Sequence, residues 1–274
     1  MALTVNTNMA ALHATSIMQG TNRSLNSAFQ HISSGLRITK AADDAAGLAV
    51  AENLEAQSIS LRQARRNTND GISVIQTAEG ATNEIANVVK RMRELAVEAA
   101  SETLNSTERS YVQTEFNALK SEVNRIAQVT EFNGIKLTNT AASHAVQVGS
   151  HNTANDRIAI ATINMTTASL GITTGVQLST AAQAQDALIH FDSAVDTLNT
   201  QRATLGATQN RLNSALNNLE VYTENLDSAE SQIRDADFAH ETAEMAKFQI
   251  MQQAGTAILA QANQINQGAL RLLG

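Results

Sequence analysis

One run of apolar residues, from Leu54 to Ala99, constrains the fold of this chain more than any other feature. In alternating steps of three and four residues, ten of fourteen positions are apolar, and the pattern closes every seven residues over 46 residues without a proline. A repeat of 3.5 residues predicts a helix that winds around partner helices. At 1.5 Å per residue such a helix is about 70 Å long, so it requires partners of similar length.

Two further stretches with the same spacing predict those partners. One runs from Val112 to Ile126 and follows the short polar segment 101–107, so we expect it to pack antiparallel to the first helix. The other runs from Phe191 to Ile233, with nine apolar residues among thirteen seam positions. Because its length matches that of the first long helix, we expect the two long helices to pair.

Between these predicted helices, the spacing of apolar residues changes to every second residue. Asn133-Gly134 is a typical hairpin turn, and apolar residues alternate in 145–148 and again in 158–163. We therefore expect a small β region at about 131–178. The predicted fold class is mainly α, with long antiparallel coiled-coil helices, a small β-hairpin region in the middle, and paired N- and C-terminal helices.

The two ends of the chain carry looser amphipathic helices. Residues 4–33 are expected to be helical and to end at Gly35, after which Asp43 or Asp44 caps the long helix. From Glu244 onward, large apolar residues recur every seven positions, with mostly small residues at the other seam position. Neither helix buries a core by itself, so both are predicted to be association surfaces that become ordered on assembly. The predicted contact residues are Met18, Leu25, Phe29, Ile32, Phe248, Met251, Ile258, Ala262, Ile265 and Leu272.

These patterns divide the chain into four predicted regions. Residues 1–42 form the N-terminal helix and a linker, and residues 43–180 form the first half of a central coiled-coil domain that includes the β region. Residues 181–234 form the second long helix of that domain. Residues 235–274 form a second linker and the C-terminal helix.

Composition and motifs exclude several classes of function. The chain has no Cys, Pro or Trp, and 19 basic against 26 acidic residues give a net charge of −7, which argues against nucleic-acid binding. No apolar run is long enough to cross a membrane, and the first twenty residues lack the pattern of a cleavable secretory signal. The segment His240-Glu241-Thr-Ala-Glu244 lacks the second histidine of a zinc-protease helix. We therefore predict no metal, no cofactor and no enzymatic activity.

A series of motifs resembles bacterial flagellin over nearly the whole chain. The resemblance implies a structural subunit that is exported unfolded and polymerises into the helical filament of the flagellum, with the terminal helices as its polymerisation interface. The motifs are Val5-Asn-Thr-Asn8, Asn69-Asp-Gly-Ile-Ser73, Ala78-Glu-Gly-Ala81, Arg91-Met-Arg-Glu-Leu-Ala-Val97, Glu131-Phe-Asn-Gly134, Val146-Gln-Val-Gly149, Ile233-Arg-Asp-Ala-Asp-Phe238 and Ala262-Asn-Gln264.

The resemblance also implies partners and a location. The expected partners are other copies of the chain, an export chaperone at the C-terminal helix, hook-junction and cap proteins, and host flagellin receptors, with no nucleic acid and no membrane insertion. The expected location is the extracellular flagellar filament, with a periplasmic filament as the alternative. Asn266 stands where many family members have proline, so the last helix is expected to continue unbroken.

Two segments resemble sites that host receptors recognise in flagellins. Lys90, Arg91, Leu95 and Glu115 resemble the patch bound by the animal Toll-like receptor. The segment Gln30 to Ala51 resembles the epitope of the plant receptor, although Leu36 and Ala42 depart from it. The residues that agree with this epitope are Gln30, Ser33, Gly35, Arg37, Ile38, Asp43, Asp44, Gly47 and Leu48.

Three alternatives remain open from the sequence. A hook–filament junction protein shares terminal heptads but is expected to lack the motifs between Asn69 and Val97. A flagellin with a protease in its centre requires the missing His-Glu-x-x-His motif. A coiled-coil adaptor of the cytoplasm is not secreted into the medium from intact cells, whereas a flagellin is.

Overall fold

The computed structural model describes the backbone of residues 7–273 and the side chains of residues 7–264. Five helices dominate the chain, as the heptad pattern predicts: α1 (Met9–Ser34), α2 (Ala45–Ala99), α3 (Ser106–Val129), α4 (Ala181–Arg234) and α5 (Phe238–Leu273). Four short strands and one 3-10 turn lie between α3 and α4. They are β1 (Glu131–Phe132), β2 (Ile135–Lys136), β3 (Ala142–Gln147), η1 (Ala154–Asp156) and β4 (Arg157–Thr162).

The chain forms two compact units, and the long helices α2 and α4 contribute to both. The first unit comprises the described parts of Met1–Gln57 and Asn225–Gly274, and the second is Ser58–Glu224. Within the described residues, no helix is long and apolar enough to cross a membrane.

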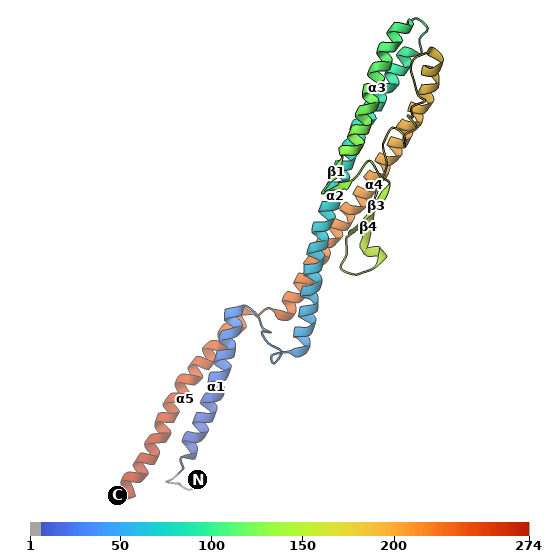
Figure 1. Cartoon of the computed structure of the whole chain (residues 1–274). Helices are drawn as coiled ribbons and strands as arrows, with labels where there is room; N and C mark the ends of the chain where they lie inside the picture. Colours follow the sequence, from blue (N-terminus) through green and yellow to red (C-terminus); the bar gives the residue numbers. More distant parts are fainter. Residues whose placement is uncertain (1–6, 274) are drawn as a thin grey trace. The chain divides into compact units, whose positions relative to one another are not determined.

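In the second unit, α2, α3 and α4 lie side by side (Figure 1). The predicted α2 seam is confirmed here, because all twelve of its positions from Leu61 to Ala99 are buried. Two ion pairs show the antiparallel direction of α2 and α4, because Arg65 pairs with Glu220 at 3.9 Å and Arg93 pairs with Asp192 at 2.7 Å.

A short loop reverses the chain between α2 and α3. The guanidinium of Arg109 donates hydrogen bonds to the carbonyl oxygens of Ala99, the last residue of α2, and of Ser101, in the loop that follows. Asn105 and Glu108 form a capping box at the start of α3. The apolar core then joins all three helices, with Phe116 of α3 packed edge-to-face on Phe191 of α4 at 5.9 Å between ring centroids.

The predicted β region consists of two small antiparallel hairpins. Asn133 and Gly134 both have positive φ, 47° and 78°, and they join β1 to β2 as the Asn-Gly pattern predicts. Strands β3 and β4 pair over six residues each, from Ala142 opposite Thr162 to Gln147 opposite Arg157. The β4 residues Ile158 and Ile160 are buried in a cluster that contains α2 and α4 residues.

Gly71 allows the β3–β4 hairpin to approach α2 closely. A Cβ at Gly71 would lie 3.0 Å from Val146 Cγ2 and 3.4 Å from Leu212 Cδ1, whereas a Cβ at Gly80 on the same helix meets nothing within 4 Å. We expect Gly71→Leu to lower the free energy of unfolding of the second unit by about 1–3 kcal/mol, because overpacking displaces the hairpin.

The matched variant Gly80→Leu is expected to stabilise the same unit by about 0.5–1 kcal/mol, because leucine is a better helix former than glycine. Denaturant unfolding of both variants, followed by circular dichroism, measures the difference. Equal stability of the two variants would show that the hairpin does not pack on α2 at Gly71.

In the first unit, α1 and α5 pack along each other, which confirms the predicted pairing of the terminal helices. Among the described residues, α1 begins at Met9, where the side chain of Asn8 caps it by accepting a hydrogen bond from the Ala11 N–H at 3.0 Å. The predicted helix is therefore wrong for residues 7 and 8, and residues 4–6 lie outside the described residues. Gly35 ends α1 in the left-handed conformation, with φ of 72°, as expected. At the other end of the unit, α5 continues unbroken through Asn266 to Leu273.

Candidate functional site

The two faces of the α1–α5 pair differ, and the predicted contact residues divide between them. Toward the partner helix, Met18, Leu25, Ile32 and Phe248 are half-buried, and Ala262 is buried. Away from it, the side chains of Phe29, Met251 and Ile258 are 63%, 42% and 60% exposed. The side chains of Ile265 and Leu272 lie outside the described residues.

Small residues allow close approach of the two terminal helices. A Cβ at Gly255 would lie 3.9 Å from Met18 Cγ, and the Nδ2 of Asn8 donates a hydrogen bond to the Ala262 carbonyl at 3.0 Å. The small heptad position of α5 therefore faces α1, while Met251 and Ile258, from the large position, remain exposed. The sequence analysis assigned the large and the small heptad positions of α5 to one contact surface. In the structure, only the small heptad position packs against α1.

The α1–α5 pair has more exposed large apolar residues than the heptad pattern indicated. They lie outside the predicted heptad positions, so the heptad pattern did not identify them. Their apolar character in the sequence was the only indication that they could form a contact. These additional exposed side chains are Met9, Leu12, Ile17, Phe238 and Ile250. Together with Phe29, Met251 and Ile258 they are called the terminal apolar face below.

Part of the terminal apolar face forms a groove of ≈ 630 Å³. The groove contains one polar side chain, that of His13, and its other lining residues are apolar or small. The lining residues are Met9, Ala10, Leu12, His13, Ala14, Ile17 and Ile258. Exposed apolar surface of this kind is typical of a site that another protein covers.

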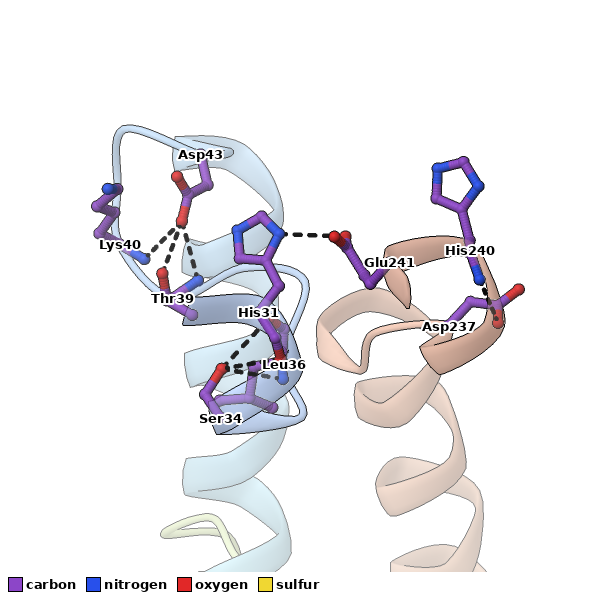
Figure 2. A network of polar contacts seen from close by, with 9 residues as sticks. All are labelled: His31, Ser34, Leu36, Thr39, Lys40, Asp43, Asp237, His240 and Glu241. Atoms are coloured by element: carbon purple, nitrogen blue, oxygen red, sulfur yellow. Dashed lines mark hydrogen bonds and ion pairs between the residues drawn. The ribbon is translucent and has the colours of Figure 1, made fainter. Parts of the chain in front are cut away.

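In the first unit, a polar contact joins α1 to α5 beside the two linkers (Figure 2). His31 Nδ1 of α1 lies 3.1 Å from Glu241 Oε1 of α5. Asp237 caps α5 by accepting hydrogen bonds from the backbone N–H groups of Ala239 and His240. The two linkers are also joined by a β-bridge between Leu36 and Asp235.

The carboxylates of Asp43 and Asp44 are both used structurally. Asp44 Oδ1 accepts a hydrogen bond from the Gly47 N–H at 2.9 Å, so it caps α2 as predicted. Asp43 Oδ2 closes the linker by accepting hydrogen bonds from the Thr39 hydroxyl and from the N–H groups of Thr39 and Lys40. Desolvation raises the pKa of Asp43, but these hydrogen bonds and the Lys40 charge outweigh it, and the pKa is lowered from its usual value.

The predicted animal receptor patch is only partly on the surface. Lys90 and Arg91 are exposed on α2, and Arg91 Nη2 pairs with Glu115 Oε1 of α3 at 3.0 Å. The hydrogen bonds that Arg91 donates to the carboxylates of Glu94 and Glu115 raise the pKa of Arg91. Leu95, by contrast, has 1% of its side chain exposed and lies in the helical core, so its side chain supports α2 from below the patch.

The predicted plant epitope covers the end of α1, the linker and the start of α2. Gln30, Ser33, Gly35, Arg37 and Asp43 are exposed. Asp44, Gly47 and Leu48 are half-buried, whereas Ile38 is 1% exposed. The backbone N–H of Arg37 donates to the Arg234 carbonyl at 2.7 Å, so part of the epitope is hydrogen-bonded within the fold.

In the part of the chain that the structure describes, no three His, Cys, Asp or Glu side chains are grouped so that they could hold a metal ion. His240 and Glu241 serve the α5 cap and the α1–α5 contact described above. The arrangement therefore offers contact surfaces, and those surfaces are apolar on the terminal helices.

Comparison with known proteins identifies the family. Residues 5–143 match the model described as "Bacterial flagellin N-terminal helical region", and residues 188–273 match "Bacterial flagellin C-terminal helical region". The chain is 39% identical over 285 residues to the flagellar filament 33 kDa core protein of Treponema phagedenis, covering 98% of this chain and 99% of that protein. It is also 39% identical over 270 residues to a flagellin of Halalkalibacterium halodurans, with the same coverage.

A solved structure agrees with these relatives. The crystal structure of Bacillus cereus flagellin is 34% identical, has a TM-score of 0.51, and covers 56% of this chain and 88% of that one. The near-complete match to a flagellar filament core protein agrees with a location in the flagellar filament. The chain therefore belongs to the bacterial flagellin family, as a non-enzymatic structural subunit of the flagellar filament.

Proposed function

We propose that the subunit polymerises mainly through the terminal apolar face of the α1–α5 pair. The observation that carries this proposal is the set of eight large apolar side chains that remain exposed on these helices. Their burial between neighbouring subunits stabilises the filament by about 25 cal/mol per Å² of apolar surface, reduced by the entropy lost when the helices become ordered.

The same surface supports coupled ordering and assembly. The two terminal helices share one half-buried seam, and only Thr21, Ala28 and Ala262 are buried among their described side chains. Isolated helices of this kind depend on tertiary contacts for stability. We therefore expect α1 and α5 to become fully ordered only when neighbouring subunits cover their outer face.

Electron microscopy of purified protein after addition of short filament seeds tests the proposal. Long filaments of uniform width are the expected result. A protein that stays monomeric, or that stops growth at the seed ends, would contradict the proposal and favour a hook–filament junction protein.

Before assembly, the terminal apolar face needs protection from aggregation. We propose that an export chaperone covers the α5 part of this face, which includes Ile250, Met251 and Ile258. Hook-junction and cap proteins are proposed to contact the same helix pair at the filament ends. The first of these assignments is tested with two shortened chains, one that lacks α5 and one that lacks α1. We expect the chain without α5 to lose chaperone binding and the chain without α1 to retain it.

The animal receptor is proposed to bind the exposed part of its patch, namely Lys90, Arg91 and Glu115. We expect Arg91→Ala to raise the concentration for half-maximal receptor activation by about tenfold or more, because arginines often dominate such interfaces. A cell reporter of the receptor, exposed to monomeric protein, measures the change.

The matched control for that experiment is Arg93→Ala. Arg93 lies two residues away on α2 and forms a comparable exposed ion pair, with Asp192 at 2.7 Å on α4. Equal loss of activation in both variants would show that Arg91 has no specific role in recognition.

The plant epitope is proposed to be recognised as a segment released from the fold. Ile38 is buried, and the Arg37 N–H is bonded to α4, so a receptor that grips both needs the segment free. We expect a synthetic peptide of residues 30–51 to trigger the plant oxidative burst at a lower concentration than intact filaments do. Equal potency of peptide and filaments at equal subunit concentration would contradict this.

A further inference from the structure

Strand β3 is an edge strand, and one row of its backbone groups points away from β4. Just beyond the paired residues of the hairpin, the Val148 N–H donates a hydrogen bond to the Asp156 carbonyl at 2.8 Å. Hydrogen-bonded pairs alternate along an antiparallel ladder. The N–H and C=O groups of Ser143, Ala145 and Gln147 therefore point outward.

Two side chains agree with this alternation. Asn67 of α2 donates a hydrogen bond to the Gln147 carbonyl at 3.4 Å, and Gln201 of α4 donates one to the Ala161 carbonyl at 3.5 Å. Both carbonyls belong to the outward rows of their strands. The outer edge of β3 therefore lies on the α2 side of the hairpin, and the outer edge of β4 lies on the α4 side.

A groove of ≈ 380 Å³ lies beside the outer edge of β3. Residues 144–147 of β3 line it, together with Asn67, Asp70 and Val74 of α2 and Ile135 of β2. Its volume lies within the range of about 300–1,000 Å³ that is typical of ligand sites. Apolar side chains therefore lie next to a row of outward peptide groups.

Strand β3 lacks the features that usually protect an edge strand from pairing with another chain. Natural edges carry charged residues, proline or a bulge, or are covered by another element. The strand Ala142–Gln147 contains no Asp, Glu, Lys, Arg or proline, and it pairs with β4 residue by residue, without a bulge. Among the described side chains, Asn67 covers only the Gln147 end of this edge. An extended chain can therefore add to the edge through backbone hydrogen bonds.

One carboxylate determines the charge of the partner that fits the groove. Asp70 is the only Asp, Glu, Lys or Arg that lines it. The side chain of Asp70 is exposed, and it has no hydrogen-bond or ion-pair partner among the described residues. A free carboxylate beside apolar surface favours a lysine or arginine flanked by apolar side chains.

We propose that the outer edge of β3 binds an extended peptide segment of another protein, which pairs with Ser143 and Ala145 as a third strand. Because side chains alternate along a strand, one row of the peptide faces α2. In that row, apolar side chains contact Val74 and a lysine or arginine pairs with Asp70. This inference does not rest on the proposed polymerisation, because no residue of the groove belongs to the terminal apolar face.

A designed peptide tests the site. The probe has about six residues, alternates valine with threonine, carries one arginine and is blocked at both ends. Titrated into the monomeric full-length protein, it is expected to shift the amide NMR signals of Ser143 and Ala145. At saturation it is also expected to slow their hydrogen exchange by about tenfold or more. Without the peptide, these amides are expected to exchange faster than those of His144 and Val146, which are bonded to β4.

Two proline variants locate the contact. Ala145→Pro removes an outward donor without breaking a bond to β4, and Ala159→Pro makes the same change at the residue directly opposite, on β4. Both alanines are exposed, so both variants are expected to keep the wild-type circular dichroism spectrum. Ala145→Pro is expected to weaken peptide binding by about tenfold or more, because it removes a backbone hydrogen bond and blocks close approach. Ala159→Pro is expected to leave binding unchanged.

Two further comparisons use the wild-type fold or change only a side chain. Of two probes N-methylated on alternate amides, only one is expected to bind, because a strand pairs through one edge. Asp70→Asn is expected to weaken binding of the arginine probe on the order of 2- to 5-fold, and to leave unchanged the binding of a probe with glutamine in place of arginine.

Absence of any shift at Ser143 and Ala145 with millimolar probe would overturn the proposal. Equal binding of the two methylated probes, or equal loss in the two proline variants, would also overturn it, because the contact is then not made by the β3 edge. If the probe did not bind but Ala145→Pro slowed seeded elongation of filaments, a second copy of the chain would be the occupant instead. None of these results contradicts polymerisation through the terminal apolar face.

Discussion

The Ile258→Asp variant is expected to form no filaments while its monomer keeps the fold of the second unit. The side chain of Ile258 is 60% exposed in the subunit, so a carboxylate there remains hydrated in the monomer. In the filament, the proposed packing buries that carboxylate without a counter-ion, which costs several kcal/mol for each subunit added. Because 1.4 kcal/mol changes an equilibrium constant tenfold, elongation is expected to stop at any practical concentration.

Sedimentation and electron microscopy after seeding measure this effect, and circular dichroism checks the monomer. Ile258→Leu preserves the apolar surface and is expected to polymerise nearly as the wild type does. Gln249→Asp adds a charge at an exposed polar position of the same helix. It therefore shows whether a negative charge anywhere on α5 blocks assembly or only a charge at position 258. Filaments of normal yield from Ile258→Asp would show that this face is not a polymerisation contact.

Replacing Phe116 by alanine is expected to cause the largest loss of stability within the monomer. Phe116 and Phe191 are both fully buried, and their rings meet edge-to-face with an interplanar angle of 76°. Deleting a buried aromatic ring costs about 3–5 kcal/mol, since both the transfer term and the cavity contribute. For a unit of this size the unfolding temperature is expected to fall by about 6–20 °C.

Thermal unfolding followed by circular dichroism at 222 nm measures that loss. Phe116→Leu fills most of the space and is expected to cost much less. Tyr111→Ala removes an aromatic ring from the same helix, but this ring is 69% exposed, so its loss is expected to change stability by about 0.5 kcal/mol or less. A similar loss in the Phe116 and Tyr111 variants would show that the α3–α4 packing does not depend on the ring pair.

The sequence by itself determined the elements whose cause is local. The seam from Leu61 to Ala99 predicts a helix because its period is a property of neighbouring residues, and every seam position in that range is buried in the structure. Gly35, Asp44 and the Asn133-Gly134 pair also act locally, through backbone conformation or through a cap. The family resemblance was readable for the same reason, because its motifs are contiguous strings.

The tertiary structure alone decided which positions are covered. Periodicity defines a helix face, but it does not say which partner covers that face, so the sequence could not separate inward Ala262 from outward Ile258. Leu95 and Ile38 were included in surface sites by resemblance, yet both are buried in the structure, and Leu95 lies in a core that α3 and α4 share.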